Sequence, residues 1–328
     1  MSARENYVPD KWDATHIQSL QGQVAIVTGG NSGIGYVTAL ELARKGATVV
    51  LACRSEERGE AAQKKIQQEL VATPGAGKVE LAKLDVSSLK SVQDFSTSFL
   101  RTHDRLDLLI NNAGIMAVPH SLTVDGYENQ FATNHLGHFA LTAQLFELMK
   151  KSTPSRIVNV SSSAHRDAHK FNEDAIMPSK EGYETWSAYA DSKLCNILFT
   201  KEFDRRIKAA GIHDITVAAC HPGATSTNLI NAPAAENGFF TGLKWKVFNV
   251  LSPMLFNSAD IGALPTLFAA TAPNAQGGDF FGPGRFNHLI GYPVLEEPEK
   301  KSESRSAATK LWTLSEKLAH LGFDISKQ

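Results

Sequence analysis

From residue 24 onward, the chain alternates short apolar runs rich in β-branched residues with longer segments of helical periodicity. A continuous apolar run predicts a strand buried on both faces, because a strand with one solvated face would alternate apolar and polar residues. Such strands separated by helices predict a doubly wound α/β fold, a parallel sheet with helices on both sides and ligands at the carboxyl ends of the strands. The predicted strands are 24–30, 47–54, 79–86, 106–114, 155–162 and 214–223, and the predicted helices include 35–46, 55–70 and 89–102.

No Pro-, Gly- or Ser-rich hinge interrupts this alternation, so we predict a single domain over residues 23–328, preceded by an extension over residues 1–22. Two segments depart from the pattern: residues 163–184 form a polar insertion, and residues 228–260 are apolar and rich in aromatic side chains. Loops of such length in a compact domain are usually lids or binding segments, so residues 228–260 are predicted to contact a substrate. A polar linker and a terminal helix are predicted within 300–323.

Composition and charge argue against a nucleic-acid-binding, disulfide-rich or membrane-spanning protein. Of the 328 residues, 42% are hydrophobic, which is enough to bury a substantial core, and the formal net charge of −1 offers no basic field for nucleic acid. Three widely spaced cysteines indicate a reducing compartment, and no apolar run reaches the roughly 18 residues of a membrane span. We therefore expect a cytoplasmic protein without a transmembrane segment. Residues 239–251 could touch a membrane surface, but a lid over the substrate site is the favoured interpretation.

The octapeptide TGGNSGIG, residues 28–35, lies between the first predicted strand and the first predicted helix. Small residues let the backbone turn sharply and approach a pyrophosphate, and a helix N-terminus presents free N–H groups and a positive dipole end. Gly29, Gly33 and Gly35 follow the spacing G-x-x-x-G-x-G, which differs from the dinucleotide fingerprint G-x-G-x-x-G. The turn predicts nucleotide binding, and the alternative is a tight strand-to-helix turn without a ligand.

The residues after the second predicted strand indicate which dinucleotide binds. In folds of this kind an acidic residue at that position hydrogen-bonds the ribose 2′-hydroxyl of NAD. Here Cys53 is followed by Arg54, with Arg58 one helical turn later. A guanidinium forms charge-assisted hydrogen bonds with a 2′-phosphate, so NADP(H) is favoured over NAD(H) as the cofactor. The alternative is a solvated arginine at the start of a helix.

Tyr189 and Lys193 are four residues apart in a segment of helical periodicity, residues 185–203. This spacing places a phenol and an ammonium group on one helical face. The pKa of an unperturbed tyrosine is about 10, which is too high for efficient base catalysis at neutral pH, and a nearby ammonium favours the phenolate. The pair is a candidate acid/base couple, although the same spacing is also common in ordinary helix-surface contacts.

Taken together, the motifs resemble those of the short-chain dehydrogenase/reductase family, in the family's order. The stretches LACRSEERGE, TNHLGHF and SKLCNILFTKE are most similar to the retinol-dehydrogenase-like and WW-domain-oxidoreductase-like branch, and protochlorophyllide reductases are similar in the same places. The resemblance implies a Rossmann fold, a nicotinamide cofactor and hydride transfer. The matching motifs are TGGNSGIG (28–35), LDV (84–86), NNAG (111–114), NHLGH (134–138), VNVSS (158–162), YADSK (189–193) and HPG (221–223).

The resemblance implies four catalytic residues. Tyr189 would be the acid/base, and Lys193 would bind the nicotinamide ribose and lower the tyrosine pKa. Ser162 would hydrogen-bond the substrate oxygen, and Asn134 would hold a water molecule that links Lys193 to solvent.

The catalytic serine stands unusually far from the tyrosine. The separation is 189 − 162 = 27 positions, longer than is typical of compact family members, and the insertion 163–184 accounts for it. Strand alternation allows only one of Ser161 and Ser162 to face the site, and motif register favours Ser162.

The same resemblance implies contacts with the dinucleotide. Asp85 would touch the adenine amine, and Asn112 and Gly114 of NNAG would support the sheet beside the cofactor. The nicotinamide carboxamide would be bracketed by Pro222, Gly223 and Thr227. The predicted cofactor-binding residues are Gly29, Asn31, Ser32, Gly33, Ile34, Gly35, Arg54, Asp85, Val86, Asn112, Ala113, Gly114, Tyr189, Lys193, Pro222, Gly223 and Thr227.

Several histidines have spacings that suggest other chemistry. His135 and His138 are three residues apart, but no carboxylate or cysteine completes a ligand set, so no metal site is predicted. His165 and His169 lie four apart in the insertion and are interpreted as part of a polar surface loop. His221, at a strand end, is interpreted as a packed, hydrogen-bonded histidine rather than a proton shuttle.

The predicted function is oxidoreduction by hydride transfer between NADP(H) and a carbonyl or alcohol group of a lipophilic small molecule. The apolar, aromatic segment 228–256 supports a retinoid, steroid, terpenoid, polyketide or aromatic ketone as the substrate. One alternative is reduction of a double bond, as in protochlorophyllide reductase. Another is a catalytically silent dinucleotide sensor or scaffold, although neither Tyr189 nor Lys193 has been lost. The resemblance also makes a homo-oligomer one of the expected states.

Overall fold

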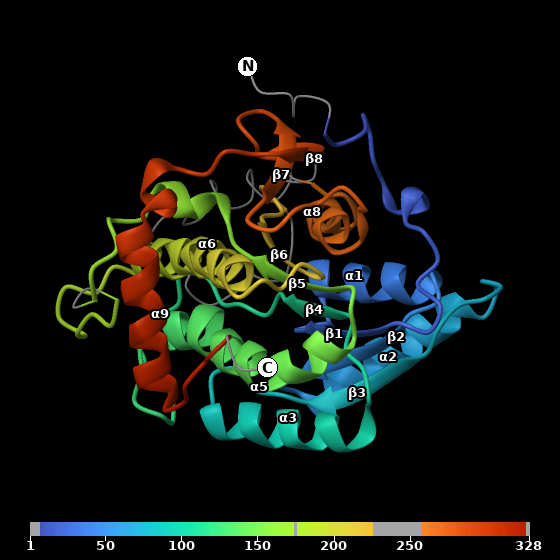
Figure 1. Ribbon diagram of the computed structural model, residues 1–328, viewed down its shortest axis with the longest axis horizontal. Coiled ribbons are helices and arrows are strands. Elements are labelled where there is room, and N and C mark those ends of the chain that lie inside the picture. Colours follow the sequence, from blue (N-terminus) through green and yellow to red (C-terminus); the bar gives the residue numbers. More distant parts are fainter. Residues whose placement is uncertain (1–6, 174–175, 226–256, 326–328) are drawn as a thin grey trace, which may run out of the picture.

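The computed structural model describes residues 7–173, 176–225 and 257–325, whose strands build one eight-stranded sheet (Figure 1). The strand order is β3-β2-β1-β4-β5-β6-β7-β8, and every neighbouring pair is parallel except β7 and β8. The predicted doubly wound fold is therefore confirmed. The strands are β1 (Val24–Thr28), β2 (Thr48–Cys53), β3 (Val79–Lys83), β4 (Leu108–Asn111), β5 (Ser155–Val160), β6 (Ile215–Cys220), β7 (Phe280–Arg285) and β8 (Ile290–Leu295).

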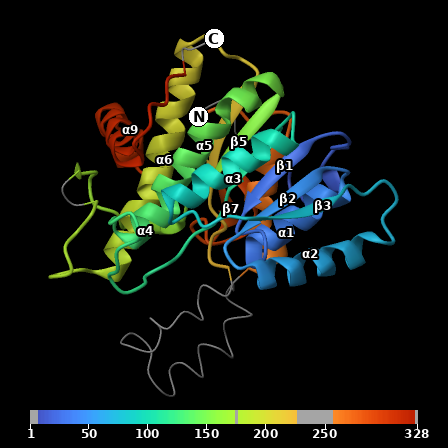
Figure 2. The same ribbon diagram turned by 90° about the horizontal axis from the view of Figure 1, so that it is seen from below.

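Helices cover both faces of the sheet (Figure 2). Helices α1, α2 and α8 pack on one face, and α3, α5 and α6 pack on the other, where α9 lies against α5 and α6. The α-helices are α1 (Gly33–Arg44), α2 (Glu56–Leu70), α3 (Leu89–Thr102), α4 (Asn129–Phe131), α5 (Gly137–Lys151), α6 (Thr185–Ala209), α8 (Ala259–Thr271) and α9 (Arg305–Ala319), and the other helical segments are η1 (Ala14–His16), η2 (Ala132–Leu136), η3 (Ser163–Arg166) and η6 (Lys300–Glu303).

The six predicted strands correspond to β1 to β6, and all of them except the partly exposed β3 are almost entirely buried, as their apolar sequences require. All five residues of β1 and all four of β4 are buried. Strand β1 ends at Thr28, the first residue of the glycine-turn motif, and β6 ends at Cys220, just before the HPG motif. These motifs form loops at the carboxyl edge of the sheet, which is where doubly wound proteins bind ligands.

The hairpin formed by β7 and β8 was not predicted. Its strands, FFGPGR and IGYPVL, contain glycine and proline residues that are typical of loops. Proline cannot donate to a sheet ladder and is therefore tolerated mainly at edges. Strand β8 is the last strand of the sheet and runs antiparallel to β7, so Pro293 lies at such an edge.

The N-terminal extension packs against the domain. Trp12 in the extension is buried, and its ring meets Phe268 of α8 edge-on at a centroid distance of 5.0 Å.

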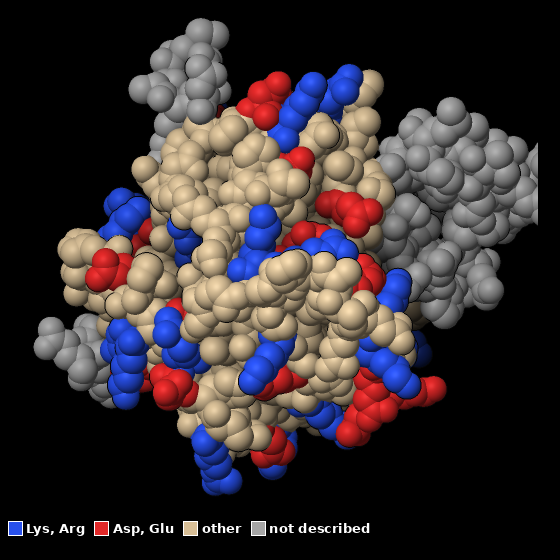
Figure 3. All heavy atoms as spheres, turned by 90° about the vertical axis from the view of Figure 1, so that its right-hand side faces the viewer, with Lys and Arg blue, Asp and Glu red and all other residues tan. Residues whose placement is uncertain are grey.

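On the face shown in Figure 3, basic and acidic side chains are interspersed, in keeping with the net charge of −1. Within the described ranges, no helix has both the length and the apolar character needed to cross a membrane. Most of the predicted substrate segment 228–260, including 239–251, lies outside the described residues.

The sheet order also shows where the chain reverses its winding. Strand β1 lies between β2 and β4, so successive connections lead in opposite directions from this point. The loops after β1 and β4 consequently separate and leave a crevice, which is the ligand-binding position of open α/β sheets. The glycine turn follows β1 and the NNAG motif follows β4, so both border this crevice.

Candidate active site

A cavity of about 330 Å³ opens at the carboxyl ends of the strands, above the point where the winding reverses. Most of the predicted cofactor-binding residues line it. Thr227 lies outside the described residues, and Gly223, Ser162 and Asn134 stand next to lining residues rather than in the wall itself. The predicted cofactor-binding residues that line the cavity are Gly29, Asn31, Ser32, Gly33, Ile34, Gly35, Arg54, Asp85, Val86, Asn112, Ala113, Gly114, Tyr189, Lys193 and Pro222.

The glycine turn forms one wall of the cavity, and its geometry excludes larger residues. Gly29 has a φ of +66°, which side chains rarely adopt. A Cβ atom on Gly35 would lie 2.5 Å from both the Asn112 Nδ2 atom and the Gly29 carbonyl oxygen. Ser32 precedes α1 without making a side-chain capping bond, so the first N–H groups of the helix remain available to an anion.

A hydrogen-bonded floor joins the glycine turn to the NNAG motif. The Thr28 hydroxyl oxygen accepts the backbone N–H groups of Asn112 and Ala113, both at 2.9 Å. The Asn112 side-chain amide donates to the Thr28 carbonyl at 2.7 Å. The His138 Nε2 atom lies 2.9 Å from the Thr28 hydroxyl. Sequence reasoning did not assign Thr28 or His138 to the site, because their role depends on contacts between residues more than eighty positions apart.

Basic residues border the end of the cavity near β2. Arg54 and Arg58 both line it with exposed side chains, and neither forms an ion pair with any residue that the structure describes. Ser55 lines the cavity between them and caps α2 by accepting the Arg58 N–H. Across the cavity, Asp85 accepts hydrogen bonds from the Ser87 backbone and hydroxyl. Two unpaired guanidinium groups can bind a phosphate monoester.

Tyr189 and Lys193 are buried together at the other end of the cavity, 6% and 4% exposed. Helix α6 holds both, and the Lys193 Nζ atom lies 5.8 Å from the centre of the tyrosine ring and donates to the Val160 carbonyl at 3.2 Å. Burial raises the pKa of Tyr189 to about 12, although a hydrogen bond with Ser162 acts to lower it. Burial also lowers the pKa of Lys193 to about 8. Burial is therefore the main cause of the shifted Tyr189 pKa, and the expected lowering of that pKa by Lys193 stays a prediction.

The two serines after β5 have different partners. The Ser161 hydroxyl is buried and donates to the Lys193 carbonyl oxygen at 2.7 Å, which ties the end of β5 to α6. The Ser162 hydroxyl accepts the Ala164 N–H at 3.1 Å, and the interaction of Ser162 with the Tyr189 phenol acts to lower the pKa of that phenol. Of the two, Ser162 is therefore the serine that adjoins the tyrosine.

Asn134 is fully buried in η2, a five-residue π-helical stretch that the sequence did not reveal. Its side chain is satisfied on both sides: Oδ1 accepts the Ile115 N–H at 2.8 Å, and Nδ2 donates to the Ile115 carbonyl at 3.0 Å and to the Ser192 hydroxyl at 2.8 Å. Its carbonyl oxygen lies 3.2 Å from the Nδ1 atom of His138. Asn134 therefore joins the loop after β4 to α6, and its predicted role in holding water stays a prediction.

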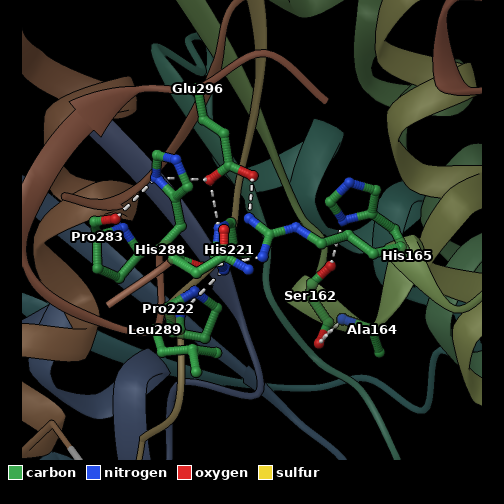
Figure 4. Close-up of polar contacts among 12 residues, drawn as sticks. Ser162, Ala164, His165, His221, Pro222, Pro283, His288, Leu289 and Glu296 are labelled. Atoms are coloured by element: carbon green, nitrogen blue, oxygen red, sulfur yellow. Dashed lines mark hydrogen bonds and ion pairs between the residues drawn. The ribbon is translucent and has the colours of Figure 1, made fainter. Parts of the chain in front are cut away.

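The interpretation of His165 as a surface residue was wrong. His165 is fully buried, its Nδ1 atom lies 2.7 Å from the Ser162 carbonyl, and its ring meets Phe280 edge-on at 5.2 Å (Figure 4). Phe280 belongs to β7, so the residue that covers His165 comes from a strand that was not predicted. His169 remains at the surface beside Asp191, at 3.3 Å.

The prediction for His221 is confirmed. Its side chain is fully buried, its Nε2 atom lies 2.8 Å from a Glu296 carboxylate oxygen, and its Nδ1 atom accepts the Gly223 N–H at 3.1 Å. Across the described part of the chain, no group of three or more His, Cys, Asp or Glu side chains is arranged to hold a metal ion.

Comparison with known proteins identifies the family. Residues 23–174 match the family model described as short chain dehydrogenase. Retinol dehydrogenase 13 of Mus musculus is 39% identical over 305 residues, an alignment that covers 92% of this chain and 85% of the relative. The chain belongs to the short chain dehydrogenase family. It is an oxidoreductase of the branch that includes the retinol dehydrogenases.

Other similarities of this short chain dehydrogenase extend over nearly the whole chain. Retinol dehydrogenase 14 of Mus musculus is 38% identical over 308 residues, covering 90% of this chain and 86% of the relative. A crystal structure of a protein from Mycobacterium Paratuberculosis aligns with a TM-score of 0.75 at 39% identity, covering 95% of this chain and 99% of that one.

Proposed function

We propose that this oxidoreductase transfers hydride between NADP(H) and a carbonyl or alcohol group of a lipophilic small molecule. The observation that carries the proposal is the placement of Tyr189, Lys193 and Ser162 at one end of a cavity whose other end is bordered by a glycine turn and unpaired arginines. This arrangement suits a dinucleotide that extends along the cavity and presents its nicotinamide beside the tyrosine.

The residues present fit the cofactor. A Cβ atom on Gly35 would meet the Asn112 side chain and the Gly29 carbonyl, so glycine at this position lets the turn pack closely onto the NNAG motif. At this turn the first N–H groups of α1 can bind the oxygens of a pyrophosphate. Arg54 and Arg58 would hold the 2′-phosphate of NADP, and Lys193 would hold the nicotinamide ribose. The bound cofactor supplies or accepts the hydride.

The protein's own groups move the proton and orient the substrate. In the reductive direction, Ser162 would donate a hydrogen bond to the substrate carbonyl oxygen, and Tyr189 would deliver a proton to it. Because burial keeps the pKa of Tyr189 high, the phenol retains its proton at neutral pH and can act as the acid. The Lys193 ammonium would stabilise the phenolate that remains. In the oxidative direction the same groups act in reverse.

Two observations support a lipophilic substrate. The relatives above are named retinol dehydrogenases, so those proteins act on a lipophilic alcohol. In this chain, the Trp186 ring lies 5.6 Å from the Tyr189 ring, is 47% exposed, and is held by a hydrogen bond from its indole nitrogen to Asp167 at 3.1 Å. An exposed aromatic side chain beside the acid/base residue offers an apolar surface to a flat substrate.

The proposal is tested by assaying aldehydes, ketones and alcohols of increasing apolar size with NADPH, NADH and their oxidised forms. We expect turnover with lipophilic carbonyls or alcohols and a lower KM for NADPH than for NADH. Cofactor binding without turnover of any substrate would instead favour the catalytically silent alternative.

Replacing Ser162 with alanine is expected to lower kcat by a factor of about 10² to 10³, because the substrate oxygen loses a positioned donor. Ser161→Ala is the matched control. It removes a buried hydrogen bond to α6, so it should lower the melting temperature while kcat falls far less. Steady-state kinetics and thermal unfolding of both variants check this prediction. The reverse ranking of the two kcat values would reassign the role to Ser161.

Carbonyl reduction is expected to be nearly constant below about pH 8 and to decline above it. The pKa of Lys193 is lowered to about 8 by burial, so the ammonium is present below that pH and is lost as the pH rises through it. Its loss removes the charge that stabilises the Tyr189 phenolate. The measurement is kcat as a function of pH with saturating NADPH, and an undiminished rate at about pH 10 would contradict the assignment.

We keep the cytoplasm as the predicted location. Its support is that Cys53, Cys195 and Cys220 are all free and buried, as expected for a protein in a reducing compartment.

A further inference from the structure

A buried carboxylate joins separate segments of the chain beside the candidate site (Figure 4). Glu296 follows β8, and its side chain is 3% exposed. One of its oxygens lies 2.8 Å from the Arg166 guanidinium, and the other lies 2.8 Å from His221 Nε2 and 3.3 Å from His288 Nδ1. These partners come from the segment after Ser162, from the end of β6 and from the turn between β7 and β8.

The contact with His221 determines where that ring carries its proton. Because His221 Nδ1 accepts the Gly223 N–H, its proton must be on Nε2, which then donates to Glu296. Burial would raise the pKa of Glu296, but the hydrogen bonds from His221 and Arg166 outweigh burial and hold the pKa of this carboxyl below its usual range. Burial lowers the pKa of His221. The pair is thus an ionised carboxylate and a neutral imidazole.

The turn between β7 and β8 has an unfavourable backbone that these contacts hold in place. Phe286, Asn287 and His288 have φ values of +50°, +53° and +62°, a left-handed conformation that non-glycine residues rarely adopt in succession. The Arg166 guanidinium donates to the Asn287 carbonyl at 2.9 Å. The His288 Nδ1 atom, which also faces Glu296, lies 3.0 Å from the Pro283 carbonyl.

The same turn supports the HPG motif at the edge of the cavity. The Leu289 carbonyl accepts the Ala224 N–H at 2.7 Å. A Cβ atom on Gly223 would lie only 2.2 Å from that carbonyl, so the two backbones are in close contact. Pro222, immediately before, lines the cavity. Glu296 therefore acts on the cavity wall by two routes, through His221 and through the β7–β8 turn.

We propose that Glu296 is a positioning residue for the reaction: it holds His221 and the β7–β8 turn so that the Pro222–Ala224 backbone keeps the nicotinamide in reach of Tyr189. This inference rests on the proposed function. Glu296 is more than a hundred residues from Tyr189 in sequence. The inference gives Glu296 a role in turnover although it contacts neither the substrate nor the reacting atoms.

The test compares Glu296→Gln with Glu297→Gln. Both remove one negative charge at neighbouring positions, but Glu297 is exposed and has no ion pair with any described residue. For each variant, NADPH binding sites are counted by fluorescence titration, and turnover is expressed per binding site. We expect Glu296→Gln to lower that turnover at least about tenfold, because small displacements of reacting groups cost this much. The Kd for NADPH should change less than about threefold, because the glycine turn and the arginines are untouched. Glu297→Gln should match the wild type.

A further variant shows whether Glu296 acts through His221. The turnover losses of Glu296→Gln and His221→Gln should be strongly non-additive in the double variant, since both remove the same interaction. A purely structural role would lower the number of binding sites and leave the turnover of each site unchanged. That outcome, or full additivity of the two losses, would overturn the proposal.

A measurement on the wild type keeps the proposal testable if Glu296→Gln does not fold. Nitrogen NMR of the histidine-labelled protein should show His221 neutral with its proton on Nε2, and a proton on Nδ1 would overturn the proposal. The spectrum needs no activity. If the wild type turns over no substrate, the proposed function fails on the substrate assay, while the His221 resonance still reports on the contact with Glu296.

Discussion

Replacing Tyr189 with phenylalanine is expected to reduce kcat for carbonyl reduction by a factor of about 10² to 10⁴, the usual contribution of a positioned general acid. The variant keeps the buried ring and removes only the hydroxyl that contacts Ser162. Hydride can still be presented by the cofactor, but no group then delivers a proton to the substrate oxygen. The Kd for NADPH should be almost unchanged, because the other cavity-lining residues remain.

Tyr127→Phe is the matched control for this prediction. It also removes one phenol hydroxyl, which donates to the Leu318 carbonyl at 2.7 Å, but Tyr127 does not line the cavity. Its kcat should stay close to that of the wild type. Steady-state kinetics and NADPH titration of the two variants provide the comparison. If Tyr189→Phe retains wild-type turnover, the acid/base assignment is wrong.

Replacing Arg54 with alanine is expected to weaken NADPH binding about ten- to hundredfold, which corresponds to the roughly 1.5–3 kcal/mol of a hydrogen bond to a charged group. NADH, which has no 2′-phosphate, should lose less than about twofold. The guanidinium borders the cavity and is not engaged by a carboxylate among the described residues, so its charge is available to a ligand. Affinities for both cofactors, measured by titration at one ionic strength, check the prediction.

The control for the arginine prediction is Arg101→Ala. Arg101 is also exposed and basic, but it lies on α3 and does not line the cavity, so its removal should weaken neither cofactor measurably. Arg58→Ala should resemble Arg54→Ala with a smaller effect, since Arg58 lies in the first turn of α2, four residues after Arg54. Equal weakening of NADPH and NADH by Arg54→Ala would reject the 2′-phosphate role.

The elements that were predicted correctly are those with a strong local pattern. Strands β1, β2, β4, β5 and β6 are rich in apolar residues, and their burial on both faces follows directly from such runs, whereas only one residue of the more polar β3 is buried. Strands β7 and β8 were not predicted because they have the composition of a turn. Their glycine and proline residues are Gly282, Pro283, Gly284, Gly291 and Pro293. They form strands because their backbones complete the sheet beside β6, a non-local reason that no short window of sequence contains.

The prediction for His165 was wrong for the same reason. A polar insertion read in isolation predicts a surface loop, yet Phe280 and the Ser162 carbonyl enclose this imidazole. The π-helical stretch that places Asn134 was likewise invisible, because a widened helical turn has no sequence signature as clear as a cap or a proline.

The sequence by itself determined the doubly wound sheet, the positions of its glycine turn and the pairing of Tyr189 with Lys193, because strand burial, backbone freedom and helical spacing are local properties. Tertiary structure alone decided that burial sets the pKa values of the pair and that Glu296 joins the loops around the site. These features depend on which distant segments exclude water from one another and meet within hydrogen-bonding distance. A motif therefore identifies the chemistry, while the fold around it sets the protonation and position of each group.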